Sequence, residues 1–337
     1  MIPFPWHRAA LERLVADRAR LPHALLVQGT QGIGKAEFAR ALAAALLCET
    51  PQGALACGKC PSCHWFSQGN HPDFREVIPE IDQEEDEAEA DAAKADVKKS
   101  LVIKIDQIRA LADFMALTTH RSGLRVLLIH PAEVLQSNAA NALLKTLEEP
   151  PPATLIVLVS DQPARLLPTI RSRCRVLPLP TPPANEAMAW LQAEGVEEPR
   201  TALAVAGGAP LLARELAAPE EVALRRKVMA ELTRPSGAEP LTFAERIDRP
   251  ALDRTIYWMQ TWVQDLLRVR VGAGVRHHLE HESMAKAKAR AADADRLFDL
   301  ERELRAARRL ATHPLNARLL AEHLLMTYNR ATSGTRT

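Results

Sequence analysis

The sequence has 337 residues, 47% of them hydrophobic, which is enough for two or three domains with apolar cores. Lys and Arg number 43 against 42 Asp and Glu. This balance argues against autonomous nucleic-acid binding, which normally requires a basic surplus. No apolar run approaches the ~18 residues of a membrane-spanning helix, and the N-terminus lacks a signal-peptide layout. We therefore expect a soluble cytoplasmic protein with no membrane partner.

A helical pattern over residues 6–20 ends at Pro22, and a short apolar strand then leads into the loop GTQGIGKA at residues 29–36. This loop matches the phosphate-binding pattern G-x-x-x-x-G-K-[ST] at every position but the last. Glycines let backbone N–H groups cradle phosphates, and a helix N-terminus adds positive charge. Lys35 would reach the β- and γ-phosphates, but Ala36 lacks the hydroxyl that holds Mg²⁺.

The sequence therefore predicts a phosphate loop whose metal contact is removed. Its nucleotide-binding residues, in a vestigial or weak site where ATP binding is in doubt, would be Gly29, Gly32, Gly34 and Lys35. An ordinary glycine turn between strand and helix is the alternative.

Four of the five cysteines are crowded into residues 48–63, namely Cys48, Cys57, Cys60 and Cys63. Two overlapping C-x-x-C pairs and a further cysteine supply four thiolates, the tetrahedral set that suits Zn²⁺, with no position left open for catalysis. We predict a structural zinc module here. Substitution of a ligand by His64 or His71 is one alternative. A disulfide is another, which a reducing compartment disfavours.

Residues 80–99 form an acidic, alanine-diluted run without aromatic residues. Such a segment buries too little apolar surface to offset its ordering entropy, so we expect a solvated insertion loop. The alternative is a docking tail that mimics the charge of DNA.

Aliphatic runs at residues 125–129 and 154–159 predict two buried strands, with a helix at 138–149 between them. In a P-loop ATPase the first of these strands should end in acidic residues that hold Mg²⁺. Here it ends in His130 and Pro131, and Glu133 comes too late, so we expect it on the surface. Alternating strands and helices around a phosphate loop imply an α/β domain with a parallel sheet covered on both faces.

Beyond the proline-rich run at 178–183 the strand signals disappear. We expect a P-loop domain over residues 1–178, a small helical domain over 179–222 and an all-helical domain over 223–337. The helical patterns behind this division lie at residues 185–194, 199–206, 210–217, 250–271, 293–312 and 315–330.

Several motifs resemble one family over nearly the whole chain, most strongly between residues 22 and 179. They are the cysteine spacing, HPD at 71–73, DQIR at 106–109, NALLKTLEEPP at 141–151 and SRC at 172–174. The family is that of the delta-prime subunits of the bacterial DNA polymerase III clamp loader. The resemblance implies an AAA+ domain with a zinc module, a helical lid domain and a helical collar domain that oligomerises.

The resemblance also implies partners and a division of labour. Members sit in an arc with the delta subunit and the ATP-hydrolysing gamma/tau subunits, and the complex acts on the sliding clamp and primer-template DNA. A delta-prime subunit is similar to a motor without its own catalysis. Ala36, the His130-Pro131 pair and Leu211, which stands where active relatives place a lid arginine, agree with that.

In this family Arg173 of the SRC motif would be the catalytic residue, acting in trans as an arginine finger on the neighbouring gamma/tau subunit. The alternative is a surface arginine held by a local carboxylate. We expect no independent enzyme activity, only a part in the DNA-directed DNA polymerase III holoenzyme, a nucleotidyltransferase complex.

Two other functions remain open from the sequence. One is an active AAA+ ATPase that uses Lys35 and Glu133 in an altered metal site. The other is a zinc-knuckle nucleic-acid binder in which Lys59 and His64 face phosphates.

Overall fold

The computed structural model describes residues 2–82, 100–116, 119, 123–235, 237–247, 249–310 and 316–333. The chain divides into two compact units, Met1–Pro183 and Ala184–Thr337. Residues 83–99 of the predicted acidic insertion lie outside the described residues. Among the described helices, none combines the length and the apolar character that crossing a bilayer requires.

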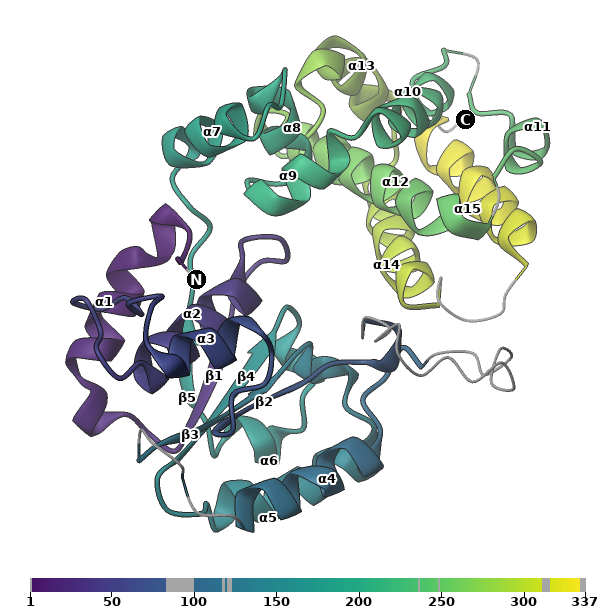
Figure 1. Cartoon of the computed structure of the whole chain (residues 1–337). Helices are drawn as coiled ribbons and strands as arrows, with labels where there is room; N and C mark the ends of the chain where they lie inside the picture. Colours follow the sequence, from purple (N-terminus) through teal and green to yellow (C-terminus); the bar gives the residue numbers. More distant parts are fainter. Residues whose placement is uncertain are drawn as a thin grey trace, which may run out of the picture. The chain divides into compact units, whose positions relative to one another are not determined.

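The first unit contains a five-stranded sheet in the order β2-β3-β4-β1-β5, and every neighbouring pair is parallel. This confirms the predicted parallel α/β fold (Figure 1). The three central strands are buried along almost their whole length, as expected for a sheet covered on both faces. The strands are β1 (Ala24–Gln28), β2 (Phe74–Val77), β3 (Arg125–Ile129), β4 (Thr154–Ser160) and β5 (Arg175–Pro178).

Helices cover both faces of this sheet (Figure 1). Apolar burial explains this arrangement. On one face, α2 buries ten of its thirteen residues. On the other face, the apolar residues of the helices form one core cluster with residues of the strands. One face carries α1 (Arg8–Ala16), α2 (Lys35–Leu47) and α3 (Pro61–Ser67); the other carries α4 (Ile105–Ala116), α5 (Ser137–Glu148) and α6 (Pro168–Arg171).

The strand register decides which loops meet. Gln28 at the end of β1 lies opposite Ser160 at the end of β4 and Pro178 at the end of β5. The loops that follow these strands therefore gather at one edge of the sheet. In open parallel sheets this carboxyl edge is where ligands bind.

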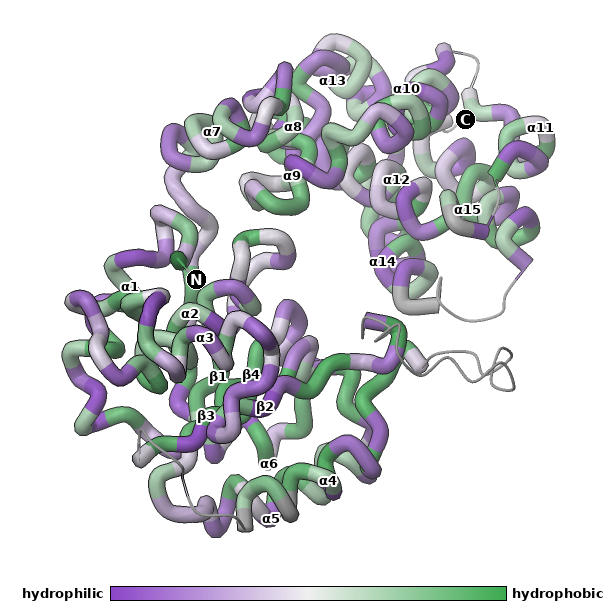
Figure 2. Tube along the Cα trace, in the orientation of Figure 1, coloured by the Kyte–Doolittle hydropathy of each residue, from purple (hydrophilic) through white to green (hydrophobic). Residues whose placement is uncertain are grey.

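All the regular secondary structure that is described in the second unit is helical, as predicted. One hydrophobic cluster runs from Ala187 to Ala331 and includes Trp258 and Trp262. Figure 2 shows how apolar and polar residues alternate along these helices. The helices are α7 (Ala184–Ala193), α8 (Pro199–Val205), α9 (Pro210–Leu216), α10 (Pro219–Leu232), α11 (Pro240–Ala244), α12 (Arg249–Arg270), α13 (Glu282–Ala291), α14 (Ala294–Leu310) and α15 (Ala317–Thr332).

The predicted boundary between lid and collar, at residues 222–223, falls inside α10. The apolar cluster also includes residues from both sides of that boundary. The division into lid and collar stays a prediction.

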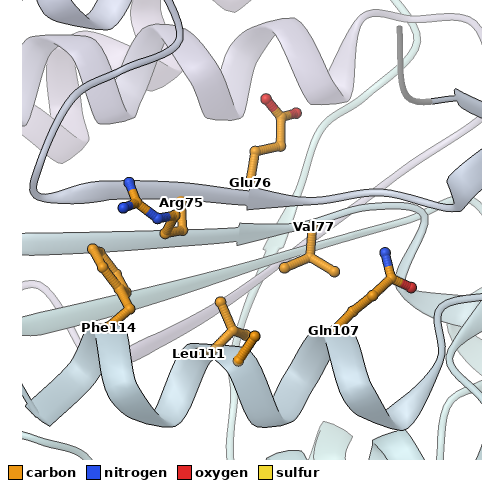
Figure 3. Close-up of a pocket in the computed structure, with 7 residues that line it drawn as sticks. Arg75, Glu76, Val77, Gln107, Leu111 and Phe114 are labelled. Atoms are coloured by element: carbon orange, nitrogen blue, oxygen red, sulfur yellow. The ribbon is translucent and has the colours of Figure 1, made fainter. Parts of the chain in front are cut away.

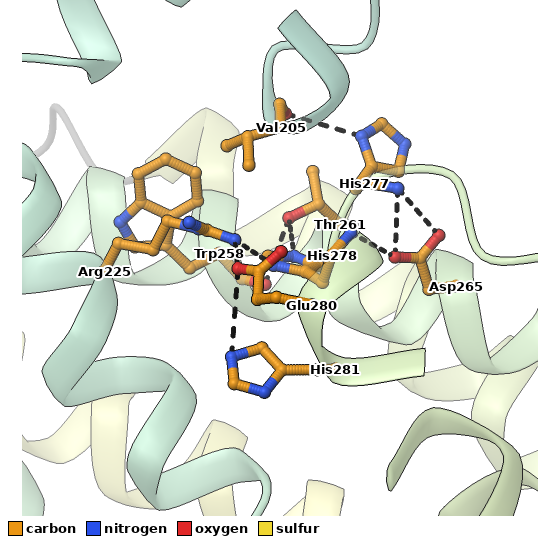
Figure 4. Close-up of polar contacts among 9 residues, drawn as sticks. All are labelled: Val205, Arg225, Trp258, Thr261, Asp265, His277, His278, Glu280 and His281. Atoms are coloured by element: carbon orange, nitrogen blue, oxygen red, sulfur yellow. Dashed lines mark hydrogen bonds and ion pairs between the residues drawn. The ribbon is translucent and has the colours of Figure 1, made fainter. Parts of the chain in front are cut away.

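A buried polar cluster ties the loop after α12 back onto that helix (Figure 4). Asp265 is fully buried and accepts backbone hydrogen bonds from Arg276, His277 and His278, with distances between 2.7 and 3.1 Å. The His278 ring contacts the Thr261 hydroxyl at 3.0 Å. Burial lowers the pKa of His278 well below its ordinary value, so the ring stays neutral. The cluster is part of the packing of this unit.

Candidate functional site

The phosphate loop connects β1 to α2, and Lys35 is the first residue of that helix. Gly34 has φ of +88°, a left-handed conformation that side chains rarely adopt, and a Cβ added there would lie 2.5 Å from the Phe4 ring. A Cβ added at Gly29 would lie 2.5 Å from the Leu179 carbonyl oxygen. Both glycines are therefore needed for the backbone path of this loop.

The Lys35 ammonium group is already bound by its own chain. Its side chain is 3% exposed, its Nζ donates to the Thr30 carbonyl at 2.6 Å, and it forms an ion pair with Asp161. Asp161 follows β4 directly, and the pairing of β4 with β1 brings it to the loop. The lysine that the sequence assigns to phosphate is thus paired with a carboxylate.

Glu133 holds Asp161 in place. Its Oε1 accepts the backbone N–H groups of Asp161 at 3.0 Å and of Gln162 at 3.2 Å. Its Oε2 is buried. The expectation of a surface glutamate is therefore wrong, because the turn after β4 packs over this side chain.

At the end of β3, the position expected to hold Mg²⁺ is filled by a network of three side chains. Arg40 donates from Nε to both carboxylate oxygens of Glu76, at 2.9 and 3.1 Å. His130 Nε2 contacts Glu76 Oε1 at 2.6 Å and an Arg40 nitrogen at 3.1 Å. Burial would raise the pKa of Glu76, but the hydrogen bonds from His130 and Arg40 outweigh it and lower that pKa.

Sequence reasoning missed Glu76 because β2 carries little strand signal. Figure 3 shows Glu76 on the opposite face of this strand from Arg75 and Val77. All three residues line a cavity of about 220 Å³ between β2 and α4, where the Arg75 guanidinium lies 4.7 Å from the Phe114 ring centroid. The face that carries Glu76 is the one that meets His130.

Residues of the N-terminal segment pack against the phosphate loop. Phe4 and Trp6 stack with ring centroids 4.9 Å apart, and Trp6 Nε1 donates to the Ile33 carbonyl at 2.9 Å. His7 is 1% exposed, and neither ring nitrogen has a hydrogen-bond partner among the described residues. Burial, together with the nearby Lys35 charge, lowers the pKa of His7 to about 4. His7 is therefore neutral at pH 7.

A cavity of about 480 Å³ adjoins the Lys35–Asp161 pair. It is lined by Gln28, Gly29, Asp161, Pro163 and residues 178–180. Leu211, the residue predicted to replace a lid arginine, lies at the start of α9 in the second unit.

The four predicted cysteines come together at the other end of α2. Their Sγ atoms all lie within 4.8 Å of one another, with separations of 3.9 Å for Cys48–Cys60 and Cys57–Cys63 and 3.6 Å for Cys48–Cys63. A tetrahedral site with Zn–S of ~2.3 Å places its sulfurs ~3.8 Å apart, so the four thiols fit zinc.

Backbone N–H groups support this cluster. Those of Lys59 and Cys60 point at the Cys57 sulfur, at 3.4 and 3.3 Å, and that of Cys63 points at the Cys60 sulfur at 3.4 Å. Such hydrogen bonds favour thiolates over thiols. The donor set could hold one metal ion and leaves no open coordination position.

The geometry weighs against the alternatives for this module. His71 lies outside the cluster because its ring is bound by the Ser62 hydroxyl at 2.7 Å and the Asp73 N–H at 3.0 Å. His64 is exposed and does not join the cysteines. The cysteines are free, at separations far above the ~2.05 Å of a disulfide. Cys174 lies apart in the sheet core, where burial raises the pKa of its thiol to about 11.

Arg173 lies between α6 and β5, near the edge of the domain. Its side chain is 35% exposed and pairs with Glu148 Oε1 at 2.6 Å, while a second nitrogen donates to the Thr169 carbonyl at 3.0 Å. Glu148, the last residue of α5, is itself half exposed. This contact is the one that the surface-arginine alternative foresaw, and the role of Arg173 in trans stays a prediction.

This first unit is an α/β P-loop domain, because a parallel sheet carries a phosphate loop at its carboxyl edge. It also contains four cysteines that could hold a metal ion, and a helical second unit follows it. The model of the family described as "DNA polymerase III, delta subunit" matches residues 7–183. The chain is 38% identical over 277 residues to DNA polymerase III subunit delta' of Pseudomonas aeruginosa, covering 80% of this chain and 78% of the relative. The Escherichia coli K12 protein of the same name is 32% identical over 277 residues, with the same coverage.

The chain belongs to the delta-prime subunit family of DNA polymerase III, as its motifs predicted. Among solved structures, a gamma subunit-related protein of DNA polymerase III from Thermotoga maritima has a TM-score of 0.45 at 17% identity and covers 96% of this chain and 99% of its own. A clamp loader delta protein of Bacillus subtilis has a TM-score of 0.32 at 10% identity, with 96% and 99% covered. At these scores neither likeness supports a conclusion about this chain.

Proposed function

We propose that this chain is a non-hydrolysing, cytoplasmic clamp-loader subunit that works with gamma/tau and delta subunits to load the sliding clamp onto primed DNA. The observation that carries the proposal is the internal pairing of Lys35 with Asp161 in a phosphate loop that also lacks its metal-binding groups. Arg173, in contrast, lies at the domain edge. We assign it to the ATP site of a neighbouring gamma/tau subunit.

The absence of catalysis follows from the loss of every group that a P-loop ATPase uses on Mg²⁺ and water. Ala36 has no hydroxyl for the metal. His130 is engaged with Glu76, whose carboxylate is neutralised by Arg40. Glu133 accepts two backbone N–H groups and is not free to activate water. These contacts weigh against the alternative of an active ATPase that uses Lys35 and Glu133.

The contact with Glu148 is compatible with a role of Arg173 in trans. Ion pairs between partly exposed side chains contribute about 0–1 kcal/mol, so an incoming phosphate can displace the carboxylate. A guanidinium is planar, permanently charged and able to donate two parallel hydrogen bonds. In a neighbouring ATP site it would offset charge that develops on the γ-phosphate oxygens.

Association with the partners is assigned to the predicted collar, residues 223–337. Helix α15 exposes Leu319 and Met326, which are seven residues apart and therefore share one helix face. An exposed apolar face of this kind suits contact with other collar helices. Leu319→Glu should weaken co-elution with gamma/tau and delta, and unchanged co-elution would place the interface elsewhere.

The test of the proposed function uses the complex reconstituted from this chain, gamma/tau, delta, sliding clamp and primed DNA. Arg173→Ala should lower clamp-dependent ATP hydrolysis about tenfold or more while assembly is unchanged. Arg175→Ala removes a nearby exposed arginine and is the matched control. An unchanged rate in the Arg173→Ala complex would leave Arg173 a surface charge.

The chain alone tests the other half of the proposal. With ATP and Mg²⁺ it should hydrolyse no more than background, and clear turnover would overturn the non-hydrolysing assignment. Lys59 and His64 are exposed beside the cysteines, but the near-equal numbers of 43 basic and 42 acidic residues weigh against a zinc-knuckle nucleic-acid binder.

A further inference from the structure

An anionic group of this chain occupies the place where the phosphate-loop lysine would meet a ligand. The Lys35 side chain is 3% exposed, and a buried ammonium requires a counter-charge. Asp161 supplies it, while the Thr30 carbonyl accepts a second hydrogen bond at 2.6 Å. In a loaded phosphate loop the β- and γ-phosphates would serve as that counter-charge.

The position of Asp161 is fixed by several contacts. The Glu133 carboxylate accepts its backbone N–H at 3.0 Å and that of Gln162 at 3.2 Å. The Ser160 hydroxyl accepts the Gln162 N–H as well, at 3.1 Å. The turn after β4 is therefore held so that the Asp161 side chain lies at the loop. A carboxylate held in this way stays at the lysine when no ligand is present.

We propose that Asp161 is the specificity-determining residue of the phosphate loop: its carboxylate takes the place of a phosphate at Lys35 and excludes nucleoside polyphosphates. The loop keeps the other groups that bind such ligands. It has the glycine backbone, the N-terminus of a thirteen-residue helix and the adjoining cavity of about 480 Å³. The neutral His7 beside it adds no competing charge.

This inference deepens the proposed function and rests on it in one respect, namely that the loop is not catalytic. Exclusion is electrostatic, because a phosphate entering beside Asp161 would place two anions at one buried ammonium. Removal of the Asp161 charge should therefore open the loop to polyphosphates without Mg²⁺, since Ala36 and His130 offer the metal no ligands. The ligand class is metal-free di- and triphosphate, either as a nucleotide or as pyrophosphate.

The experiment measures binding of ATP, ADP and inorganic pyrophosphate to the full chain in EDTA by titration calorimetry and thermal shift. Asp161→Asn should bind all three at least about tenfold more tightly than the unchanged protein and be stabilised by them. The double variant Lys35→Met/Asp161→Asn should lose this gain. Asp106→Asn, which removes an exposed carboxylate paired with Arg109, is the matched control and should change nothing.

The outcomes separate this inference from the proposed function. Binding by the unchanged protein as tight as by Asp161→Asn, or no binding by a folded Asp161→Asn, overturns the inference and leaves the proposed function intact. Hydrolysis of ATP by the unchanged chain with Mg²⁺ would overturn the non-hydrolysing assignment, whereas the binding comparison in EDTA tests Asp161 alone. If Asp161→Asn does not fold, Glu133→Gln is tested in its place. This change weakens the contacts that hold Asp161, so it should tighten polyphosphate binding by less than Asp161→Asn would. Binding no tighter than that of the unchanged protein overturns the inference.

Discussion

Helix α2 has a ligand-binding motif at each end, and the two motifs differ in whether the chain itself already supplies a partner. At its N-terminus Lys35 is paired with Asp161 and Thr30 of the same chain. At its C-terminus Cys48 joins three other thiols whose contacts are one another, nearby backbone N–H groups and the Thr50 hydroxyl. Both motifs have the right spacing, but only the cysteine end presents donor atoms with no counter-charge.

The comparison teaches that spacing alone does not decide whether a motif binds its ligand. A buried charged group needs a partner, which can come from a ligand or from the chain. Four thiols within 4.8 Å of one another can all become thiolates only when a cation binds them. One ammonium beside one carboxylate requires nothing further. Substitutions at the two ends of α2 should therefore differ in their effects on stability and ligand binding.

The largest effect is expected at the cysteine end. Purified protein should contain one zinc per chain by elemental analysis, and Cys63→Ala should lose it together with several kcal/mol of folding free energy, because structural zinc binding is coupled to folding. Cys174→Ala, which removes a buried thiol outside the cluster, should keep the metal. Protein that carries no zinc after purification in its presence would contradict the comparison.

The next effect is expected at the lysine end. Asp161→Ala leaves the buried Lys35 ammonium uncompensated and should lower the free energy of unfolding by about 3 kcal/mol in urea titrations. Lys35→Met combined with Asp161→Ala should recover most of that loss, because no lone charge remains. If the double variant is as unstable as the single one, the Lys35–Asp161 pair is not what holds the loop.

The sequence was sufficient to predict both ends of α2 and the central strands, because glycine and cysteine spacing and aliphatic runs are local signals. It did not reveal β2 and β5, the two edge strands. In β2 two apolar residues enclose Arg75 and Glu76, and β5 is mostly exposed and ends in Pro178. Short, half-exposed strands carry little periodicity.

Asp161 could not be assigned from the sequence for a different reason. Its contact with Lys35 exists because β1 and β4 are neighbours in the sheet, although α2, α3, β2, α4, β3 and α5 separate them along the chain. Strand order is a tertiary property that residue patterns do not encode locally. The internal counter-charge, and with it the state of the phosphate loop, therefore needed the structure.

A third prediction concerns the histidine beside the loop. Folding lowers the pKa of His7 from 6.5 to about 4, so between these values the unfolded chain binds a proton that the folded chain does not. The contribution of His7 is fully present above about pH 6.5 and is lost as the pH falls toward 4. A shift of this size corresponds to at most about 3 kcal/mol.

The test is His7→Leu, which keeps an apolar contact with Phe38 and removes the titrating ring. Urea unfolding at pH 7.5 and pH 4.5 should show a smaller loss of stability for this variant than for the unchanged protein. Part of the loss should persist, because burial also lowers the pKa of His277 and His278. If both proteins lose the same stability between pH 7.5 and pH 4.5, His7 is not buried beside the loop.

The smallest effect is expected where an internal pair is exposed. Glu148 pairs with Arg173 as Asp161 does with Lys35, but the two side chains are 50% and 35% exposed, so water can replace the carboxylate. Glu148→Gln should change the free energy of unfolding by less than about 1 kcal/mol. The Thr169 carbonyl still holds the guanidinium at 3.0 Å. ATP hydrolysis by the reconstituted complex should therefore stay within about twofold. Glu149→Gln, which changes the neighbouring exposed carboxylate, is the control. A tenfold loss of ATP hydrolysis that is confined to Glu148→Gln would show that the ion pair with Glu148 positions Arg173. Exposure would then not make an ion pair within the chain dispensable.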